Sequence, residues 1–254
     1  MDFTGKVVLI TGASSGIGAV TAKYLTHLGA SVVMTGRNVE SLKKSGAKCV
    51  GKHEPLLIAA DVTKEEDNVR VIEETINKYG KLDVLINNAG RGVFGSIETT
   101  SLDQLDDMLN INVRGAYHIT MLAVPHLIKS KGNIVNVSSI TGIRVFPNSL
   151  AYCISKAALD QFTRCVALEL APKQVRVNSV NPAVIATDFQ LREGMSPAQY
   201  AAFVKHSEQT HALGRIGQPQ EVAEAIAFLA ADTATFITGT CLCVDGGRTI
   251  MCPR

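Results

Sequence analysis

The chain has 254 residues, of which 46% are hydrophobic and 19% are charged, and its formal net charge is +2. This length suits one α/β domain or two small ones, with enough chain to bury a substantial core. The near balance of charges argues against nucleic acid or an anionic membrane as a partner, and no apolar run reaches the roughly 18 residues needed to span a bilayer.

The cysteines and the N-terminal sequence indicate where the protein works. None of the six cysteines has the spacing of a metal site, so we expect no metal. Met1 and Asp2 lead almost directly into an apolar strand, which leaves no room for a targeting segment. We therefore expect a cytoplasmic protein with reduced thiols, in which Cys241 and Cys243 lie buried on one face of a strand.

Short β-branched runs alternate with helical patterns along the whole chain. The predicted strands are Lys6–Ile10, Ser31–Thr35, Leu56–Ala59, Val84–Ile86, Asn133–Val137, Val175–Val180 and Cys241–Val244. The predicted helices are Ile17–Leu28, Glu65–Tyr79, Leu102–Lys129, Ala151–Leu170 and Glu221–Ala230. The strands are continuously apolar, which is typical of a sheet covered on both faces. The pattern predicts one α/β domain over residues 1–254, with a doubly wound parallel sheet of about seven strands.

The segment 188–213 interrupts this alternation. It follows a strand but is longer than a simple crossover, and it carries Phe189, Tyr200 and Phe203 among polar residues. Such a segment is either a lid over a ligand or an ordinary pair of surface helices.

A glycine-rich turn joins the first strand to the first helix. Residues 11–18 read Thr-Gly-Ala-Ser-Ser-Gly-Ile-Gly, so the spacing is Gly-x-x-x-Gly-x-Gly rather than the commoner Gly-x-Gly-x-x-Gly. Glycines let the backbone approach a pyrophosphate, and the amides at a helix start attract it. Plain turns also use glycine, so it is the position between first strand and first helix that favours a dinucleotide site. Asp61 and Val62 follow the third strand, where they either meet an adenine or simply cap the next helix.

Tyr152 and Lys156 are four residues apart in a helical pattern, so they share one face. An ammonium beside a phenol favours the phenolate, and we expect it to lower the pKa of Tyr152 enough for acid–base catalysis. The alternative is an exposed pair on a helix surface.

Two further polar residues are candidates for the site. Ser139 ends a strand and either bonds a substrate oxygen or caps a turn. Asn112 stands inside a helical pattern that asparagine disfavours, which suggests a kink or a functional side chain.

The end of the second strand indicates which dinucleotide is bound. An NAD-selective site places an acid there for the ribose hydroxyls, but Gly36 carries none, and the Arg37 guanidinium suits a 2′-phosphate. We therefore expect NADP(H) in preference to NAD(H).

Taken in order, these motifs resemble the short-chain dehydrogenase/reductase family in its compact, NADP-preferring branch, and the resemblance covers essentially the whole chain. It implies a Rossmann-type sheet in which Tyr152 exchanges the proton, Ser139 orients the carbonyl, Lys156 also bonds the nicotinamide ribose, and Asn112 holds a water. The cofactor-binding residues that the motifs and the resemblance together indicate are Gly12, Ser14, Ser15, Gly16, Ile17, Gly18, Arg37, Asn38, Asp61, Val62, Asn88, Ala89, Gly90, Tyr152, Lys156, Pro182, Ile185 and Thr187. One departure is Ala183, where the family usually has glycine.

By the same resemblance, the residues that line the substrate pocket are Gly92, Val93, Phe94, Ile140, Thr141, Arg144, Phe146, Phe189, Tyr200 and Phe203. This wall is mostly apolar and favours a lipophilic ketone or alcohol such as a steroid, terpenoid or acyl chain, with Arg144 either in the pocket or a solvated loop residue. The resemblance also implies a homotetramer, or else a dimer. The alternatives that remain are a 3-oxoacyl-carrier-protein-type reductase and a non-catalytic dinucleotide-binding regulator.

Overall fold

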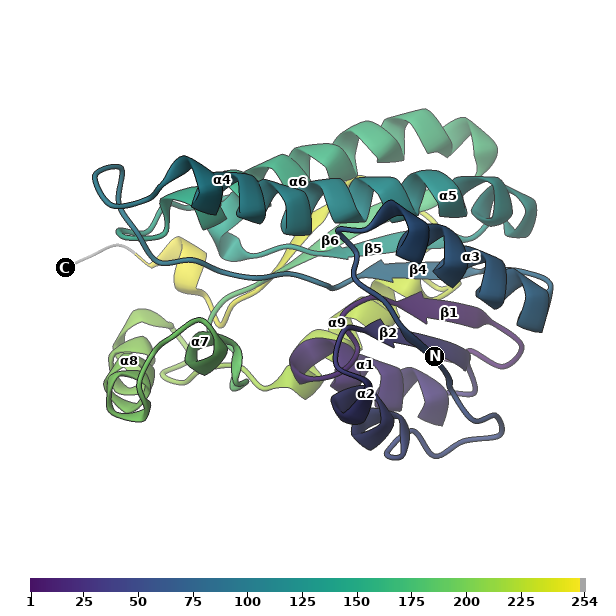
Figure 1. Ribbon diagram of the computed structural model, residues 1–254, viewed down its shortest axis with the longest axis horizontal. Coiled ribbons are helices and arrows are strands. Elements are labelled where there is room, and N and C mark those ends of the chain that lie inside the picture. Colours follow the sequence, from purple (N-terminus) through teal and green to yellow (C-terminus); the bar gives the residue numbers. More distant parts are fainter. Residues whose placement is uncertain (252–254) are drawn as a thin grey trace.

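The computed structural model describes residues 1–251 and contains one seven-stranded, wholly parallel sheet (Figure 1). The strands follow the spatial order β3-β2-β1-β4-β5-β6-β7. Their bounds are β1 Val7–Ile10, β2 Ser31–Gly36, β3 Leu56–Ala59, β4 Val84–Asn87, β5 Asn133–Val137, β6 Arg176–Pro182 and β7 Cys241–Val244. The order reverses beside β1, so the sheet is doubly wound, as the alternating pattern predicts.

Helices cover both faces of the sheet (Figure 1). One face carries α1 (Gly16–His27), α2 (Val39–Gly46) and α9 (Pro219–Ala230). The other carries α3 (Glu65–Tyr79), α4 (Leu102–Leu109), α5 (Gly115–Ser130) and α6 (Leu150–Leu170). The central strands β1 and β5 are completely buried between these layers, which explains why the apolar residues of β1 are continuous rather than alternating; β5 buries the polar Asn133 and Asn136 along with its apolar residues.

The predicted helix over Leu102–Lys129 is two helices in the structure. A capping box at Ser101 and Gln104 starts α4, and a π-helical turn over Asn110–Arg114 separates it from α5. The turn lies where Asn112 disfavours a regular helix. A β-carbon on Gly115 would lie 3.0 Å from the Val62 side chain, so α5 approaches the loop after β3 too closely for a larger residue.

Helix α2 was missing from the predicted elements. Asn38 caps its N-terminus by accepting a hydrogen bond from the Ser41 amide at 2.8 Å, and only Leu42 and Gly46 are buried. An eight-residue helix with so narrow an apolar stripe gives little periodicity to detect. Its cap residue and the lysines in its last turn were the available signals.

The segment 188–213 contains two helices, α7 (Phe189–Arg192) and α8 (Pro197–Thr210). In Figure 1 they lie beyond the ends of the strands, apart from both helical layers. No helix among residues 1–251 combines the length and the apolar character needed to cross a membrane.

The expectation of buried thiols in β7 was wrong. Cys241 and Cys243 are half-buried, because β7 is the last strand of the sheet and has a neighbour on one side only.

Candidate active site

The glycine-rich turn between β1 and α1 closes against the end of β4. Gly12 has a φ of +65°, and a β-carbon there would lie 2.7 Å from the Ala89 Cα, so no other residue fits without moving the backbone. The Asn88 side chain donates to the carbonyls of Thr11 and Gly12, both at 2.9 Å. These bonds hold the turn in a shape that leaves the first amides of α1 open to a ligand.

The end of β2 lies beside the same turn. A β-carbon on Gly36 would lie 3.1 Å from the Ser14 hydroxyl oxygen, so an acidic side chain at position 36 would crowd this serine. Arg37 follows as an exposed side chain, and the side chain of Asn38 is occupied in capping α2.

Asp61 is used in local structure at the start of α3. Its carboxylate accepts from the amide and hydroxyl of Thr63, at 3.0 and 2.8 Å, while its own amide donates to the Asp67 carboxylate. Asp61 thus stabilises the turn before α3 and does not cap the helix, whose N-cap residue is Lys64 without a side-chain cap bond.

A cavity of about 510 Å³ opens at the carboxyl ends of the strands. It runs from the glycine-rich turn, past the ends of β4, β5 and β6, to α7 and α8. Predicted site residues that line it are Gly12, Ser14, Ser15, Gly16, Ile17, Asn88, Ala89, Gly90, Gly92, Val93, Phe94, Ser139, Ile140, Thr141, Phe146, Tyr152, Lys156, Pro182, Ile185, Thr187, Phe189 and Phe203. Ala183 lines it as well.

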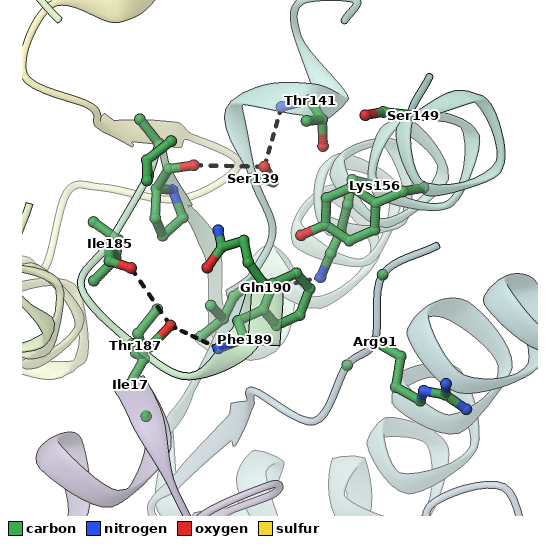
Figure 2. Close-up of a pocket in the computed structure, with 18 of the residues that line it drawn as sticks. Ile17, Arg91, Ser139, Thr141, Ser149, Lys156, Ile185, Thr187, Phe189 and Gln190 are labelled. Carbon is green, nitrogen blue, oxygen red and sulfur yellow. Dashed lines mark hydrogen bonds between the residues drawn. The ribbon is translucent and has the colours of Figure 1, made fainter. Parts of the chain in front are cut away.

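Tyr152 and Lys156 face this cavity from the first turns of α6. The Lys156 side chain is only 4% exposed, its ammonium donates to the Val137 carbonyl at 2.9 Å, and it lies 5.7 Å from the centre of the Tyr152 ring. Figure 2 shows the Lys156 side chain reaching inward between Ser139 and Phe189. The two residues are therefore part of an enclosed site and not the exposed helical pair that the spacing also allowed.

Burial controls the charges of this pair. Burial raises the pKa of Tyr152 to about 12, although a hydrogen bond with Ser139 acts to lower it. Burial also lowers the pKa of Lys156 to about 8. We had expected the ammonium to lower the pKa of the phenol. That expectation was wrong for the protein alone, because desolvation disfavours the charged phenolate and raises the pKa of Tyr152. At neutral pH Tyr152 is a phenol and Lys156 an ammonium.

Ser139 is held from several sides at the end of β5. Its hydroxyl accepts from the Thr141 amide at 3.2 Å and lies 3.5 Å from the Pro182 carbonyl, as Figure 2 shows. Its carbonyl accepts from the Asn181 side chain, which also donates to Asp160, both at 2.8 Å. The turn-capping and substrate-facing alternatives are thus compatible, because the capped hydroxyl still lines the cavity.

Asn112 fixes the loop that follows β4. From the π-helical turn its side chain accepts from the Arg91 amide and donates to the Arg91 carbonyl, both at 2.9 Å, and it also donates to Ser155. A β-carbon on Gly90 would lie 3.1 Å from the Asn112 oxygen and 3.5 Å from the Lys156 nitrogen, so glycine is what lets these groups approach. The predicted water held by Asn112 stays a prediction.

Comparisons with known proteins agree with this geometry. A family model described as enoyl-(acyl carrier protein) reductase matches residues 12–249. The chain is 37% identical over 254 residues to the 3-oxoacyl-acyl-carrier-protein reductase of Thermotoga maritima, covering 98% of this chain and 100% of that protein. A crystal structure of a short-chain dehydrogenase/reductase with cofactor from Caenorhabditis elegans is 36% identical with a TM-score of 0.93, over 98% and 97% of the two chains. The chain belongs to the short-chain dehydrogenase/reductase family.

Family membership makes the chain an oxidoreductase with a nicotinamide dinucleotide site. A solved relative, the 3-ketoacyl-acyl-carrier-protein reductase of Brucella melitensis, is complexed with NADH; it is 35% identical with a TM-score of 0.87, over 97% of this chain and 99% of that one. The Rossmann-type fold predicted from the resemblance is confirmed.

The structure does not bring every predicted site residue to the cavity wall. Those that lie outside it are Gly18, Arg37, Asn38, Asp61, Val62, Asn112, Arg144 and Tyr200. Arg144 is exposed and its guanidinium donates to the Thr249 carbonyl at 2.6 Å, which agrees with the alternative of a solvated loop residue. Tyr200 also lies outside the wall, although it is one helical turn before the wall residue Phe203 on α8.

Several wall residues were not predicted from the sequence. Gln190 lines the cavity, and its side-chain oxygen is buried without a hydrogen-bond partner among residues 1–251. Arg192, in the same helix α7, donates to the Ser15 hydroxyl at 2.5 Å. His206 and Arg248 are further polar wall residues that were not predicted. No motif marks these positions, although all of them follow strands of the sheet or lie in the segment 188–213.

The pKa of Lys156 makes a prediction about stability. The unfolded lysine titrates near 10.5 and the folded one near 8, so between these values the unfolded chain binds more protons and stability rises with pH. The gain by pH 10.5 is roughly 3 kcal/mol and is absent from Lys156→Met. Urea unfolding without cofactor between pH 7 and 10 measures it. Above pH 10 the titration of Tyr152 lowers the stability as the pH rises, and it does so in both the wild-type protein and Lys156→Met. Parallel pH curves for the two proteins would contradict the prediction.

Proposed function

We propose that the protein is an NADP(H)-dependent oxidoreductase that interconverts a ketone or aldehyde and an alcohol, with Tyr152 as the general acid and base. The observation that carries the proposal is the enclosed wall shared by Ser139, Tyr152 and Lys156 at one end of a cavity whose other end is the glycine-rich turn. Carbonyl reduction needs a proton donor beside a dinucleotide site, and both are present in a single space.

The residues at the turn fit a dinucleotide. Gly12 lets the turn pack against the Ala89 backbone, α1 begins with open amides, and the Arg192 guanidinium reaches the Ser15 hydroxyl. When bound, the cofactor supplies or accepts the hydride. Pro182, Ile185 and Thr187 would border its nicotinamide, and the Lys156 ammonium would bond its ribose.

In the reductive direction the chain supplies the proton and holds the carbonyl. Ser139 donates a hydrogen bond to the carbonyl oxygen, which orients the carbon and draws charge onto the oxygen. The Tyr152 hydroxyl transfers its proton to that oxygen as the alcohol forms. The neighbouring Lys156 ammonium stabilises the phenolate that results. A phenol whose pKa is raised by burial stays protonated at neutral pH, ready to act as the acid.

The preference for NADP(H) is supported by the end of β2. Gly36 places no carboxylate near the adenosine ribose, a larger side chain there would crowd Ser14, and Arg37 follows as an exposed cation. A guanidinium binds a phosphate with two parallel hydrogen bonds. Such a site favours the 2′-phosphate over a bare hydroxyl.

The substrate is proposed to be lipophilic. Val93, Phe94, Ile140, Phe146 and Phe203 supply apolar wall. The segment 188–213 acts as a lid: the Phe189 ring lies 6.0 Å from the Tyr152 ring, and Figure 2 shows it in the middle of the site. Excluding water in this way strengthens the hydrogen bonds to the carbonyl.

Assembly into a homo-oligomer, a tetramer by family resemblance or else a dimer, is supported by an apolar surface. On α5 and α6 the side chains of Tyr117, Met121 and Leu168 are 56%, 53% and 78% exposed. Uncovered side chains of this size on neighbouring helices suit a contact between copies.

A panel of ketones tests the reaction. With enzyme in catalytic amounts, NADPH oxidation is followed against steroid, terpenoid and acyl ketones, and each active substrate is repeated with NADH. We expect turnover with several apolar ketones and a higher kcat/KM with NADPH. Binding of NADPH without oxidation, even in a single turnover with excess protein, would support the dinucleotide-binding regulator instead.

A further inference from the structure

The wall of the cavity is strongly biased in charge. Among residues 1–251 the wall has no aspartate or glutamate, yet it includes the basic side chains Arg91, Lys156, Arg192, His206 and Arg248. Cations gathered in one cavity repel each other and raise the local concentration of anions. Each of them therefore needs a partner or a ligand.

Three of these basic groups are accounted for. Arg91 pairs with Glu193 at 3.4 Å, and Figure 2 shows its side chain directed away from the other labelled residues. Lys156 belongs to the catalytic pair. Arg192 lies on the Ser15 hydroxyl in the glycine-rich turn, where the pyrophosphate of a dinucleotide is expected. An anionic cofactor thus explains the charge at the end of the cavity near α1.

Arg248 lies at the other side, away from that turn. It begins a short 3₁₀ turn after β7, and its guanidinium carbon is 4.9 Å from the centre of the Phe146 ring. Phe146 follows the strand end that carries Ser139, so Arg248 is on the substrate wall and not on the cofactor wall. The stacking on an aromatic ring holds the guanidinium plane in place.

This guanidinium has no anionic partner. Its side chain makes no hydrogen bond or ion pair within the described part of the chain, and burial lowers its pKa with no acid opposing the effect. Asp245 is nearby in sequence, but its carboxylate accepts from the Gly247 amide and from the amide and hydroxyl of Thr249. A half-buried cation without a partner is unfavourable, and an anionic ligand would relieve that cost.

We propose that Arg248, together with His206 of α8 on the wall of the same cavity, forms a subsite for an anionic oxygen group on the substrate. The inference rests on the proposed function and narrows it: the substrate is an oxo or hydroxy compound whose apolar body ends in a carboxylate or a phosphate. The apolar residues hold the body, the Arg248 guanidinium binds two anionic oxygens, and the His206 imidazole donates a hydrogen bond from the lid.

Binding measurements test the subsite without turnover. Calorimetry on the protein, alone and with saturating NADP⁺, compares hexanoate, hexyl phosphate and the neutral hexanamide. We expect at least one anion to bind about 10- to 100-fold more tightly than hexanamide. The tighter of the two anions identifies the group. Equal affinity for all three, or no binding of any at millimolar concentration, would overturn the proposal.

Variants assign the effect to the guanidinium. Arg248→Gln should remove the preference for the anion, and Arg248→Lys should restore part of it. Lys173→Gln is the matched control, because it removes one exposed positive charge just before β6, at the amino ends of the strands and away from the cavity. If Arg248 serves only to pack on Phe146, Arg248→Gln will lower the thermal midpoint and leave the anion preference intact, which counts against the subsite.

Kinetics separate this inference from the proposed function. With NADPH, 5-oxohexanoate is compared with its methyl ester; Arg248→Gln should lower kcat/KM for the acid about 10- to 100-fold and leave the ester within about twofold. Reduction of both compounds with no preference for the acid would reject the subsite and leave the oxidoreductase intact. Anion binding through Arg248 without reduction of any ketone would reject the reaction and leave the subsite intact.

Discussion

Replacing Tyr152 by phenylalanine should lower kcat for ketone reduction about 10²- to 10⁴-fold, which is the range that general acid catalysis contributes. The substitution removes one oxygen and keeps the ring that packs 6.0 Å from Phe189, so the lid contact and the fold should persist. NADPH affinity should change by no more than a few fold. Single-turnover oxidation of NADPH with excess protein measures the chemical step, and fluorescence titration measures cofactor binding.

The matched control for this variant is Tyr79→Phe. Tyr79 ends α3, far from the cavity, and its substitution removes the same atom. It should leave the rate unchanged. A Tyr152→Phe protein that keeps more than a tenth of the wild-type rate would show that another group delivers the proton.

Replacing Arg37 by aspartate should reverse the choice of dinucleotide. The change removes an exposed cation at the end of β2 and introduces a carboxylate that repels a 2′-phosphate but accepts hydrogen bonds from a free ribose hydroxyl. We expect kcat/KM with NADPH to fall about 10²- to 10³-fold, and kcat/KM with NADH to stay within a few fold. Steady-state kinetics with one ketone and both cofactors provide the ratio.

A remote charge reversal provides the comparison for Arg37→Asp. Lys173→Asp makes the same change in net charge at the opposite edge of the sheet and should affect the two cofactors equally. Equal losses with NADPH and NADH in Arg37→Asp itself would count against a phosphate site at this position.

Local sequence was enough to predict the sheet. Strands such as β1 are short apolar runs bounded by polar residues, and burial on both faces favours that pattern; β5 and β6 also carry polar residues, but their valines and isoleucines still mark them. Helix α2 was missed, and the division between α4 and α5 was indicated only by the kink that Asn112 suggests; the reasons are related. An eight-residue helix buries too little surface to show a period, and a π-helical turn inserts one residue without interrupting the apolar pattern on either side.

The charges of the catalytic pair show where such reasoning fails. Spacing correctly brings Lys156 near Tyr152, at 5.7 Å from its ring, but it carries no information on how deeply the pair is buried. Burial proved to dominate, and it raises the pKa of the phenol. Desolvation depends on every element packed around α6, so no stretch of sequence reports it.

By itself, the sequence determined the doubly wound fold, the position of the glycine-rich turn and the residues that the family motifs mark, because these depend on neighbours close along the chain. Only the tertiary structure decided which other side chains share the cavity. Arg192 donates a hydrogen bond to Ser15, which is 177 residues away in the sequence, and the Arg248 guanidinium stacks on the Phe146 ring. Parallel strands bring their carboxyl ends to one edge whatever their separation in the chain, so the wall is assembled from loops that carry no common pattern.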